Sequence, residues 1–259
     1  MSLQFDEQAA KTLERMYQTP DVVGQRARFH QTLALRKGER VLDVGVGPGL
    51  LAREMADSVG ETGRIAGIDQ SVDMLKMTET RCSELPHTEF READATKLPY
   101  PDESFDAVVS TQVYEYVPDM GKALSEAARV LRKGGRIQIL DTAWDSVVWN
   151  TSDSKRMNRV MNAWDEHLHH PNLPTTLGTR LRKAGFDWSI CEIIPIINAS
   201  FHSNCYSHGI SAAIRQFVTD RQGITRDEAS AWRDEFKQQE EEGRYFFSLN
   251  RYLFAGIKH

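Results

Sequence analysis

The chain has 259 residues, of which 40% are hydrophobic and 27% are charged, and its formal net charge is -5. This length and composition allow one α/β domain with an added cap and a sizeable core. The acidic balance and the lack of a dense Lys/Arg run argue against a nucleic-acid partner, because phosphate neutralisation dominates such binding.

The first half of the chain predicts helices, followed by strands that alternate with helices. Helical spacing covers 7–18 and a second helix that Asp21 could cap and that Lys37-Gly38 ends. Short apolar, β-branched runs predict the strands 40–44, 64–69, 88–91, 105–110 and 136–140. Helical patterns lie between these strands. The alternation favours a doubly wound, mostly parallel, Rossmann-like α/β sheet with helices on both faces.

The second half of the chain has a different pattern. The segments 143–174 and 198–243 are predicted to be helical insertions, while strands are predicted at 188–197 and 245–257. Together with the earlier strands, these give a seven-stranded sheet, for which we expect an antiparallel last strand. We expect a single domain, 1–259, with a core of 36–142, 175–197 and 244–259 and a helical cap of 1–35, 143–174 and 198–243.

The stretch 41–49, VLDVGVGPG, says most about chemistry, because a predicted strand ends there in a glycine-rich turn that opens a helix. Glycines allow positive φ and close approach of the backbone to a ligand, and a helix N-terminus offers free N–H groups. A dinucleotide fingerprint, G-x-G-x-x-G/A, is not met, because Leu50 stands at its last position. The pattern is D-x-G-x-G-x-G, made by Asp43, Gly45, Gly47 and Gly49.

This pattern resembles motif I of the class I S-adenosylmethionine-dependent methyltransferases, and further features follow it in order. Asp69 ends the next predicted strand, and Asp94 follows the third. The runs LPYPDESFD, VPD and LRKGG are similar to those of the ubiquinone/menaquinone-biosynthesis-like methyltransferases, the methyltransferase type 11 group. The resemblance spans roughly 39–141 and is specific for the cofactor rather than for the acceptor.

The resemblance implies a binding site for S-adenosyl-L-methionine, which methyl transfer converts to S-adenosyl-L-homocysteine. Asp69 would accept hydrogen bonds from the ribose hydroxyls, as acids at this position do in nucleotide folds. Asp94 would lie near the adenine amino group, Gln112 near the methionine part, and Tyr17 on a helix that folds over the cofactor. The residues expected to bind the cofactor are Asp43, Gly45, Gly47, Gly49, Asp69, Gln70, Asp94, Ala95, Gln112 and Tyr17.

Methyl transfer is an in-line displacement, so the protein mainly has to align the acceptor atom, the methyl carbon and the sulfur. A hydroxyl or an enolisable carbon also needs a base. Candidates for the base are Tyr114, Tyr116, Asp141, Asp145, His167, His169, His170, His202 and His208. The predicted catalytic candidates are Tyr116, Asp141 and His170, although related sequences often carry His where this chain has Tyr116. Because 141–142 reads Asp-Thr and not the Asp-Asn of metal-dependent catechol-type enzymes, we predict no metal.

We therefore expect an enzyme that transfers a methyl group to the N, O, S or C atom of a small molecule. The segment 110–114 lacks the D/N-P-P-Y of amino-group DNA methyltransferases. Two alternatives stay open: an arsenite methyltransferase, which would need suitably placed thiolates, and a non-catalytic regulatory protein that binds S-adenosylmethionine. The sequence is compatible with a monomer or a homodimer.

Cysteine use and hydropathy bear on the compartment. Cys82, Cys191 and Cys205 are far apart in sequence and have no metal-ligand spacing, which favours a reducing environment. The segment 1–10 lacks the apolar run of a signal peptide, and no apolar run reaches the length of a membrane span. We expect a cytoplasmic protein with no membrane partner.

Overall fold

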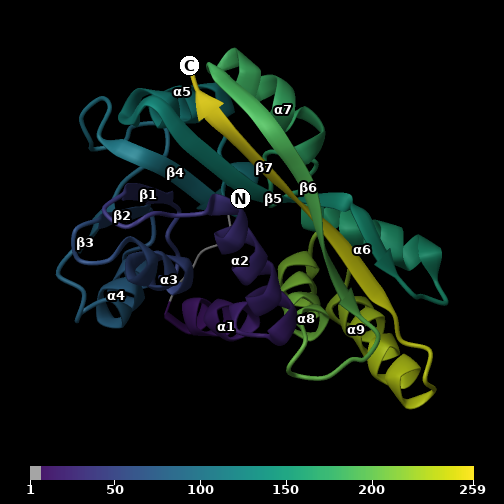
Figure 1. Ribbon diagram of the computed structural model, residues 1–259. Helices are drawn as coiled ribbons and strands as arrows, with labels where there is room; N and C mark the ends of the chain where they lie inside the picture. Colours follow the sequence, from purple (N-terminus) through teal and green to yellow (C-terminus); the bar gives the residue numbers. More distant parts are fainter. Residues whose placement is uncertain (1–6) are drawn as a thin grey trace.

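The computed structural model describes residues 7–259, and its centre is one seven-stranded sheet (Figure 1). The strand order is β3-β2-β1-β4-β5-β7-β6. Strands β1 to β5 pair in parallel, whereas β7 runs antiparallel to both β5 and β6. The predicted fold class is thereby confirmed. The strands are β1 (Arg40–Val44), β2 (Arg64–Asp69), β3 (Thr88–Glu92), β4 (Phe105–Thr111), β5 (Leu131–Trp149), β6 (Phe186–Asn198) and β7 (Phe247–Lys258).

Helices cover both faces of the sheet and extend beyond its end. They are α1 (Glu7–Tyr17), α2 (Pro20–Leu33), α3 (Leu50–Val59), α4 (Val72–Arg81), α5 (Met120–Val130), α6 (Ser154–Asp165), α7 (Pro174–Lys183), α8 (Tyr206–Val218) and α9 (Arg226–Glu241), with a 3₁₀ turn, η1 (Tyr114–Tyr116). None of these described helices has the length and apolar character that crossing a membrane requires.

The predicted cap of α2 is wrong, because the N-cap position lies two residues earlier than expected. Thr19 occupies the N-cap position with an extended backbone, and Pro20 opens the helix. Proline suits the first helical position because its fixed φ is already helical and its missing N–H would have no partner there. Asp21 instead accepts hydrogen bonds from Asn198 Nδ2 and the Tyr206 backbone N–H, at 2.7 and 3.0 Å.

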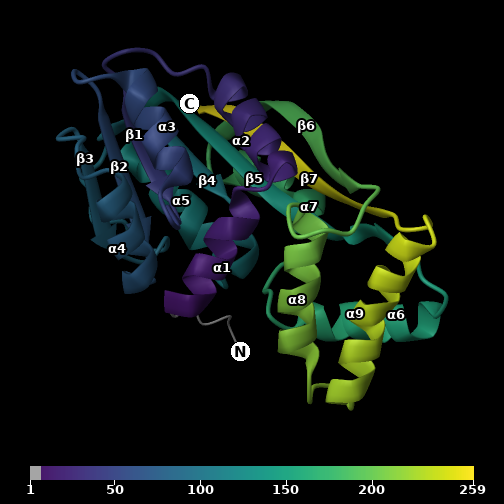
Figure 2. The same ribbon diagram turned by 90° about the horizontal axis from the view of Figure 1, so that it is seen from below.

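The helical insertion predicted from 143 is also wrong at its start, because β5 continues to Trp149. Val148 and Trp149 pair with Ser248 and Phe247 of β7 after a register shift. The stretch 143–149, AWDSVVW, carries two valines and two tryptophans, which suit a strand that pairs with a long neighbour. As a result β5, β7 and β6 extend past β4 as an antiparallel arm that leads to α6, α8 and α9 (Figure 2).

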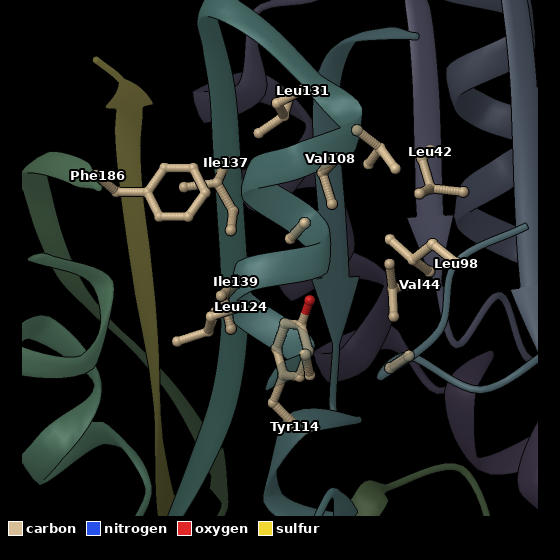
Figure 3. Packing of buried hydrophobic residues seen from close by; sticks show 14 of the residues in the cluster. Leu42, Val44, Leu98, Val108, Tyr114, Leu124, Leu131, Ile137, Ile139 and Phe186 are labelled. Carbon is tan, nitrogen blue, oxygen red and sulfur yellow. The ribbon is translucent and has the colours of Figure 1, made fainter. Parts of the chain in front are cut away.

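Buried apolar side chains form three clusters. One lies between the sheet and the helices α5 and α7, where Val44, Leu124 and Ile139 surround the Tyr114 ring (Figure 3). A second lies between the sheet and the helices α2 and α3. The third lies among α6, α8 and α9 and contains four tryptophans, Trp144, Trp149, Trp164 and Trp232.

Helix α1 connects these parts of the molecule. It contacts three helices: α2, α4 beside the first half of the sheet, and α8, which packs with α6 and α9 (Figure 2). The first six residues of the expected cap segment 1–35 lie outside the described residues. The end of α1 therefore stands where the two halves of the molecule meet.

Candidate functional site

The turn after β1 has a backbone shape that glycine adopts most easily. Gly45, Gly47 and Gly49 have φ values of 75°, 55° and 78°, in a region that L side chains rarely enter. A Cβ atom on Gly45 would lie 2.2 Å from Val113 Cγ2, and one on Gly49 would lie 2.7 Å from Thr78 Cγ2. A Cβ on Gly47 would meet nothing within 4 Å. Packing therefore requires two of the glycines, whereas the third borders open space.

Neighbouring elements hold this turn through its backbone groups. Thr78 Oγ1 of α4 donates a hydrogen bond to the Gly47 carbonyl at 2.6 Å, and Arg81 Nε donates to the Pro48 carbonyl at 2.8 Å. Asp69 Oδ2, at the end of β2, accepts a hydrogen bond from the Gly47 N–H at 2.9 Å. The turn is therefore preorganised before any ligand binds.

Two carboxyl groups beside the turn lie in unusual environments. Asp43 is 1% exposed, and its Oδ1 atom has no hydrogen-bond partner. Burial, with a smaller effect of the charge of Asp69, raises the pKa of Asp43 to about 7. Burial also raises the pKa of Asp69, although the Ser71 and Gly47 N–H groups oppose this shift. Each oxygen of Asp69 accepts one of these backbone bonds and retains capacity for a second donor.

The next strand end brings two more of the predicted residues together. Gln70 Nε2 donates to Asp94 Oδ2 at 3.1 Å, and the Thr96 N–H donates to Asp94 Oδ1 at 2.7 Å. Both Gln70 and Asp94 are exposed, whereas Ala95 is buried in the cluster beneath α5. Because β2 and β3 are adjacent and parallel, Asp69, Gln70 and Asp94 lie along one edge of the sheet.

Gln112 follows β4 and contacts β5, whereas Tyr17 comes from α1. Gln112 has a φ of 59°, its Nε2 donates to the Leu140 carbonyl at 3.1 Å, and its Oε1 accepts from Thr142 Oγ1 at 2.5 Å. The side-chain amide of Gln112 is thus bound to β5. Tyr17, at the end of α1, is half-buried, and desolvation raises the pKa of its hydroxyl.

A buried polar cluster beside the turn was not predicted as a unit. Glu115 Oε2 accepts a hydrogen bond from Trp144 Nε1 at 3.1 Å. Asp141 Oδ1 accepts from the Val113 N–H at 3.1 Å, and Asp141 Oδ2 has no partner. Glu115 and Asp141 are 1% and 0% exposed. We call Glu115 and Asp141 the carboxyl pair.

Arg251 of β7 supplies the positive charge beside the carboxyl pair and is itself 3% exposed. Its guanidinium donates to Thr142 Oγ1, Gln25 Oε1 and the Tyr206 hydroxyl at 3.3, 2.5 and 3.0 Å. A signal for it existed in the sequence, because an arginine interrupts the apolar run YFFSLNRYLFAGI. The sequence did not indicate which residues it would meet.

Burial dominates the titration of the carboxyl pair. It raises the pKa of Glu115 to about 7, against the opposing charge of Arg251 and the Trp144 hydrogen bond. It raises the pKa of Asp141 well above its usual range, and the nearby charge of Glu115 raises it further. Two carboxyls in one desolvated site do not both ionise readily. Burial and their mutual repulsion therefore favour a proton on the pair.

The three predicted catalytic candidates have different surroundings. Asp141 belongs to the carboxyl pair, and Tyr116 is close enough for both carboxyl charges to raise its pKa further, after the larger effect of burial. His170 contacts the Val117 carbonyl through Nε2 at 3.1 Å, and burial lowers its pKa. The structure thus brings Asp141 and Tyr116 together, whereas His170 contacts the backbone after η1.

His167 and Trp144 form an aromatic wall beside Tyr116, on the side of the helices α6, α8 and α9. The His167 ring lies 5.7 Å from that of Tyr116 and 6.3 Å from that of Trp144, measured between centroids. Burial lowers the pKa of His167 to about 4, so the ring is neutral, and its Nε2 atom has no hydrogen-bond partner. The wall presents apolar faces and one unused acceptor atom.

The three cysteines lie apart from one another. Cys82, Cys191 and Cys205 are free and lie on three different segments, at the end of α4, on β6 and before α8. Within this described part of the chain, no group of three or more His, Cys, Asp or Glu side chains could hold a metal ion.

Comparison with known proteins assigns the first half of the sheet to a family. Residues 42–139 match the type 11 family described as "Methyltransferase domain". The demethylmenaquinone methyltransferase of Lysinibacillus sphaericus is 33% identical over 125 residues, which are 48% of this chain and 53% of that protein. The chain spans about half the length of the curated relatives it matches.

Solved structures match over more of the chain. A proposed methyltransferase from Bacillus halodurans is 25% identical, with a TM-score of 0.64 over 91% of this chain and 99% of that one. Phosphoethanolamine N-methyltransferase 2 of Haemonchus contortus, in complex with S-adenosyl-L-methionine, shares the fold at 20% identity and a TM-score of 0.64, over 98% of this chain and 58% of that one. Residues 42–139 thus match a methyltransferase domain, and the chain shares the fold of these solved methyltransferase structures.

Proposed function

We propose that the chain transfers the methyl group of S-adenosyl-L-methionine to a small-molecule acceptor. One observation carries the cofactor assignment: the preorganised turn borders open space at Gly47 and lies beside Asp43, whose buried Oδ1 atom has no partner. Buried polar atoms in folded proteins almost always have a hydrogen-bond partner, so an unpaired one suits a bound donor.

The surrounding donors and acceptors fit an adenosyl group that carries an amino acid. The two Asp69 oxygens, each with capacity for another bond, suit the ribose hydroxyls. Asp94 and Gln70, on the neighbouring strand end, suit the adenine. Gln112 and Tyr17 would border the methionine part. When bound, the cofactor supplies an electrophilic methyl group on a positively charged sulfur.

The acceptor site would lie between η1, the end of β5, and the cap. We propose that α1, α6, α8 and α9, together with their connections, form this cap. Tyr17, Tyr116, Trp144 and His167 would then bound an enclosed chamber that excludes water. The named acceptors of two similar proteins, demethylmenaquinone and phosphoethanolamine, are small molecules, which supports the same class of acceptor here.

Calorimetric binding of S-adenosyl-L-homocysteine to wild type and Asp69→Asn tests the cofactor assignment. We expect an affinity loss of about 10- to 100-fold, because the variant loses charge-assisted hydrogen bonds worth about 1.5–3 kcal/mol. Asp73→Asn is the matched control, since Asp73 lies nearby on α4 and pairs with Lys76. Unchanged affinity in Asp69→Asn would refute the ribose assignment. A folded wild type that binds neither S-adenosylmethionine nor S-adenosylhomocysteine at millimolar concentration would refute the proposed function.

A further inference from the structure

The carboxyl pair, Glu115 and Asp141, has no task in the cofactor assignment. Resting on the proposed function, we propose that the pair is the proton acceptor of methyl transfer and that the positive sulfur of the bound cofactor prepares it by displacing its proton. The acceptor molecule would then be one that carries a proton on the reacting atom, namely a hydroxyl, an N–H or an acidic C–H.

The pair lies directly beside the glycine turn. The Val113 side chain packs so closely on Gly45 that a Cβ there would approach it to 2.2 Å. The backbone N–H of the same Val113 donates to Asp141 Oδ1. From the other side, the Tyr17 hydroxyl is influenced by the charges of both Asp69 and Glu115. Through Val113, Asp141 of the pair therefore adjoins the glycine turn.

The hydrogen bonds around the pair leave its charge incompletely balanced. The three guanidinium nitrogens of Arg251 donate to Thr142, Gln25 and Tyr206, so the arginine acts on the carboxyls through its charge. Asp141 Oδ2 has no partner and is fully buried. A buried carboxylate with one unpaired oxygen is disfavoured, which favours a proton on the pair until another positive charge arrives.

The tyrosines around the pair keep their protons at neutral pH, and Arg251 supplies the positive charge among the neighbouring groups. Burial raises the pKa of every tyrosine that the pair influences. The groups that face the pair are Tyr17 from α1, Tyr114 and Tyr116 from η1, Tyr206 from α8 and Arg251 from β7. A positive sulfur beside this set would therefore change the protonation of the carboxyls rather than that of the tyrosines.

The charges and atoms of the proposed step balance. A bond forms between the acceptor atom and the methyl carbon, the carbon–sulfur bond breaks, and its electron pair stays on sulfur. The acceptor's proton passes to the Glu115 carboxylate. Sulfur loses one positive charge as the pair gains one proton, so the enclosed site keeps its net charge. A buried base can act here without water. The positive charge on sulfur, which favours the ionised form of the pair, arrives with the cofactor and is lost when the methyl group is transferred.

The test counts protons released when each ligand binds, by calorimetry near neutral pH in buffers of different ionisation enthalpy. S-adenosylmethionine and S-adenosylhomocysteine differ in the charged methyl-sulfur group. We expect the first to release about 0.5–1 proton more than the second. This difference should shrink toward about pH 9, because ligand-free protein then carries fewer protons on the pair.

Isosteric variants test whether the extra proton released comes from the carboxyl pair. Glu115→Gln and Asp141→Asn should each reduce the difference between the ligands to near zero while still binding S-adenosylhomocysteine. Asp165→Asn is the matched control. Burial raises the pKa of Asp165 to about 6 as well, but Asp165 lies on α6 and is not part of the carboxyl pair. Its variant should keep the wild-type difference.

Two results would overturn the inference and leave the proposed function intact. One is equal proton release by the two ligands in wild type, which needs no variant to fold. The other is a difference that persists in both pair variants. Failure of wild type to bind either ligand would instead refute the proposed function, and the inference with it.

Discussion

The two halves of this molecule build their polar sites in different ways. Beside β1 and β2, the site is built around backbone: three glycines with positive φ and carbonyls held by Thr78 and Arg81, with the carboxyls of Asp43 and Asp69 beside them. Beside β5 and β7, the site consists of side chains from η1, β5, β7, α2 and α8. A backbone site needs particular residues at adjacent positions, whereas a side-chain cluster can draw them from anywhere in the chain.

The halves also differ in their apolar support. The glycine turn is backed by the clusters on the two faces of the sheet, whereas the terminal helices enclose a separate cluster rich in tryptophan. Separate clusters of this kind can open independently of the rest of a protein. We therefore expect the stability of the cap and the binding of the cofactor to be separable.

The largest effect is expected from Trp232→Ala, which tests that separation. Trp232 is fully buried and packs edge-on against Trp149 and Phe236, at 5.4 and 5.0 Å between centroids. The cavity should destabilise the cap by about 3–5 kcal/mol in chemical denaturation. Hydrogen exchange should rise in α6, α8 and α9, while the affinity for S-adenosylhomocysteine stays within about threefold.

Phe246→Ala is the control for this change, because Phe246 is 41% exposed. Its cost should be below about 1 kcal/mol. Equal loss of amide protection in β1 and α3 of Trp232→Ala would show that the two halves unfold as one unit, and the contrast drawn between them would then be wrong.

Substitutions of the glycines separate packing from ligand access. Gly45→Ala adds a clash with Val113 to an unfavourable φ and should cost about 3 kcal/mol of unfolding free energy. Gly47→Ala adds only the unfavourable φ, worth about 1–2 kcal/mol. Both should weaken S-adenosylhomocysteine binding by more than about tenfold, which calorimetry measures.

A second change in the Gly45 variant isolates the clash. Replacing Val113 by Ala in Gly45→Ala should recover part of the lost stability, since the two closest contacts are to the Val113 methyl groups. Wild-type affinity in Gly47→Ala would mean that the open side of the turn is not where the ligand binds.

Sequence reasoning succeeded where the determining contacts are local. The turn 45–49 and the strand before it could be predicted because glycine spacing and an apolar run are read within a few residues. Of the predicted cofactor set, the structure brings Asp69, Gln70 and Asp94 to one sheet edge. Their cofactor roles remain predictions, to be tested by the variants above.

Sequence reasoning failed where distant segments decide the outcome. The stretch 143–149, expected to be helical, is strand because it pairs with β7, about a hundred residues later in the chain. Glu115 was passed over because nothing near it in sequence indicates Arg251, which the fold brings into the same buried cluster. Thr142 and Arg251 are register partners on adjacent strands, a relation that exists only after the sheet has formed.

The smallest expected effect comes from Thr78→Val, which asks how much one side-chain hydrogen bond adds to the glycine turn. Thr78 is fully buried, and Oγ1 donates to the Gly47 carbonyl at 2.6 Å. The nearly isosteric valine should lower the unfolding free energy by about 1 kcal/mol and the affinity for S-adenosylhomocysteine by about fivefold.

Thr80→Val provides the comparison, because the exposed Thr80 hydroxyl bonds only to the Lys76 carbonyl within the same helix. It should change stability by less than about 0.5 kcal/mol and leave affinity unaltered. If Thr78→Val binds the ligand as well as Thr80→Val does, the turn is held by its glycine conformations and by the bond from Gly47 to Asp69. The conformation of the glycine turn would then depend on the backbone and Asp69 and not on the Thr78 hydroxyl.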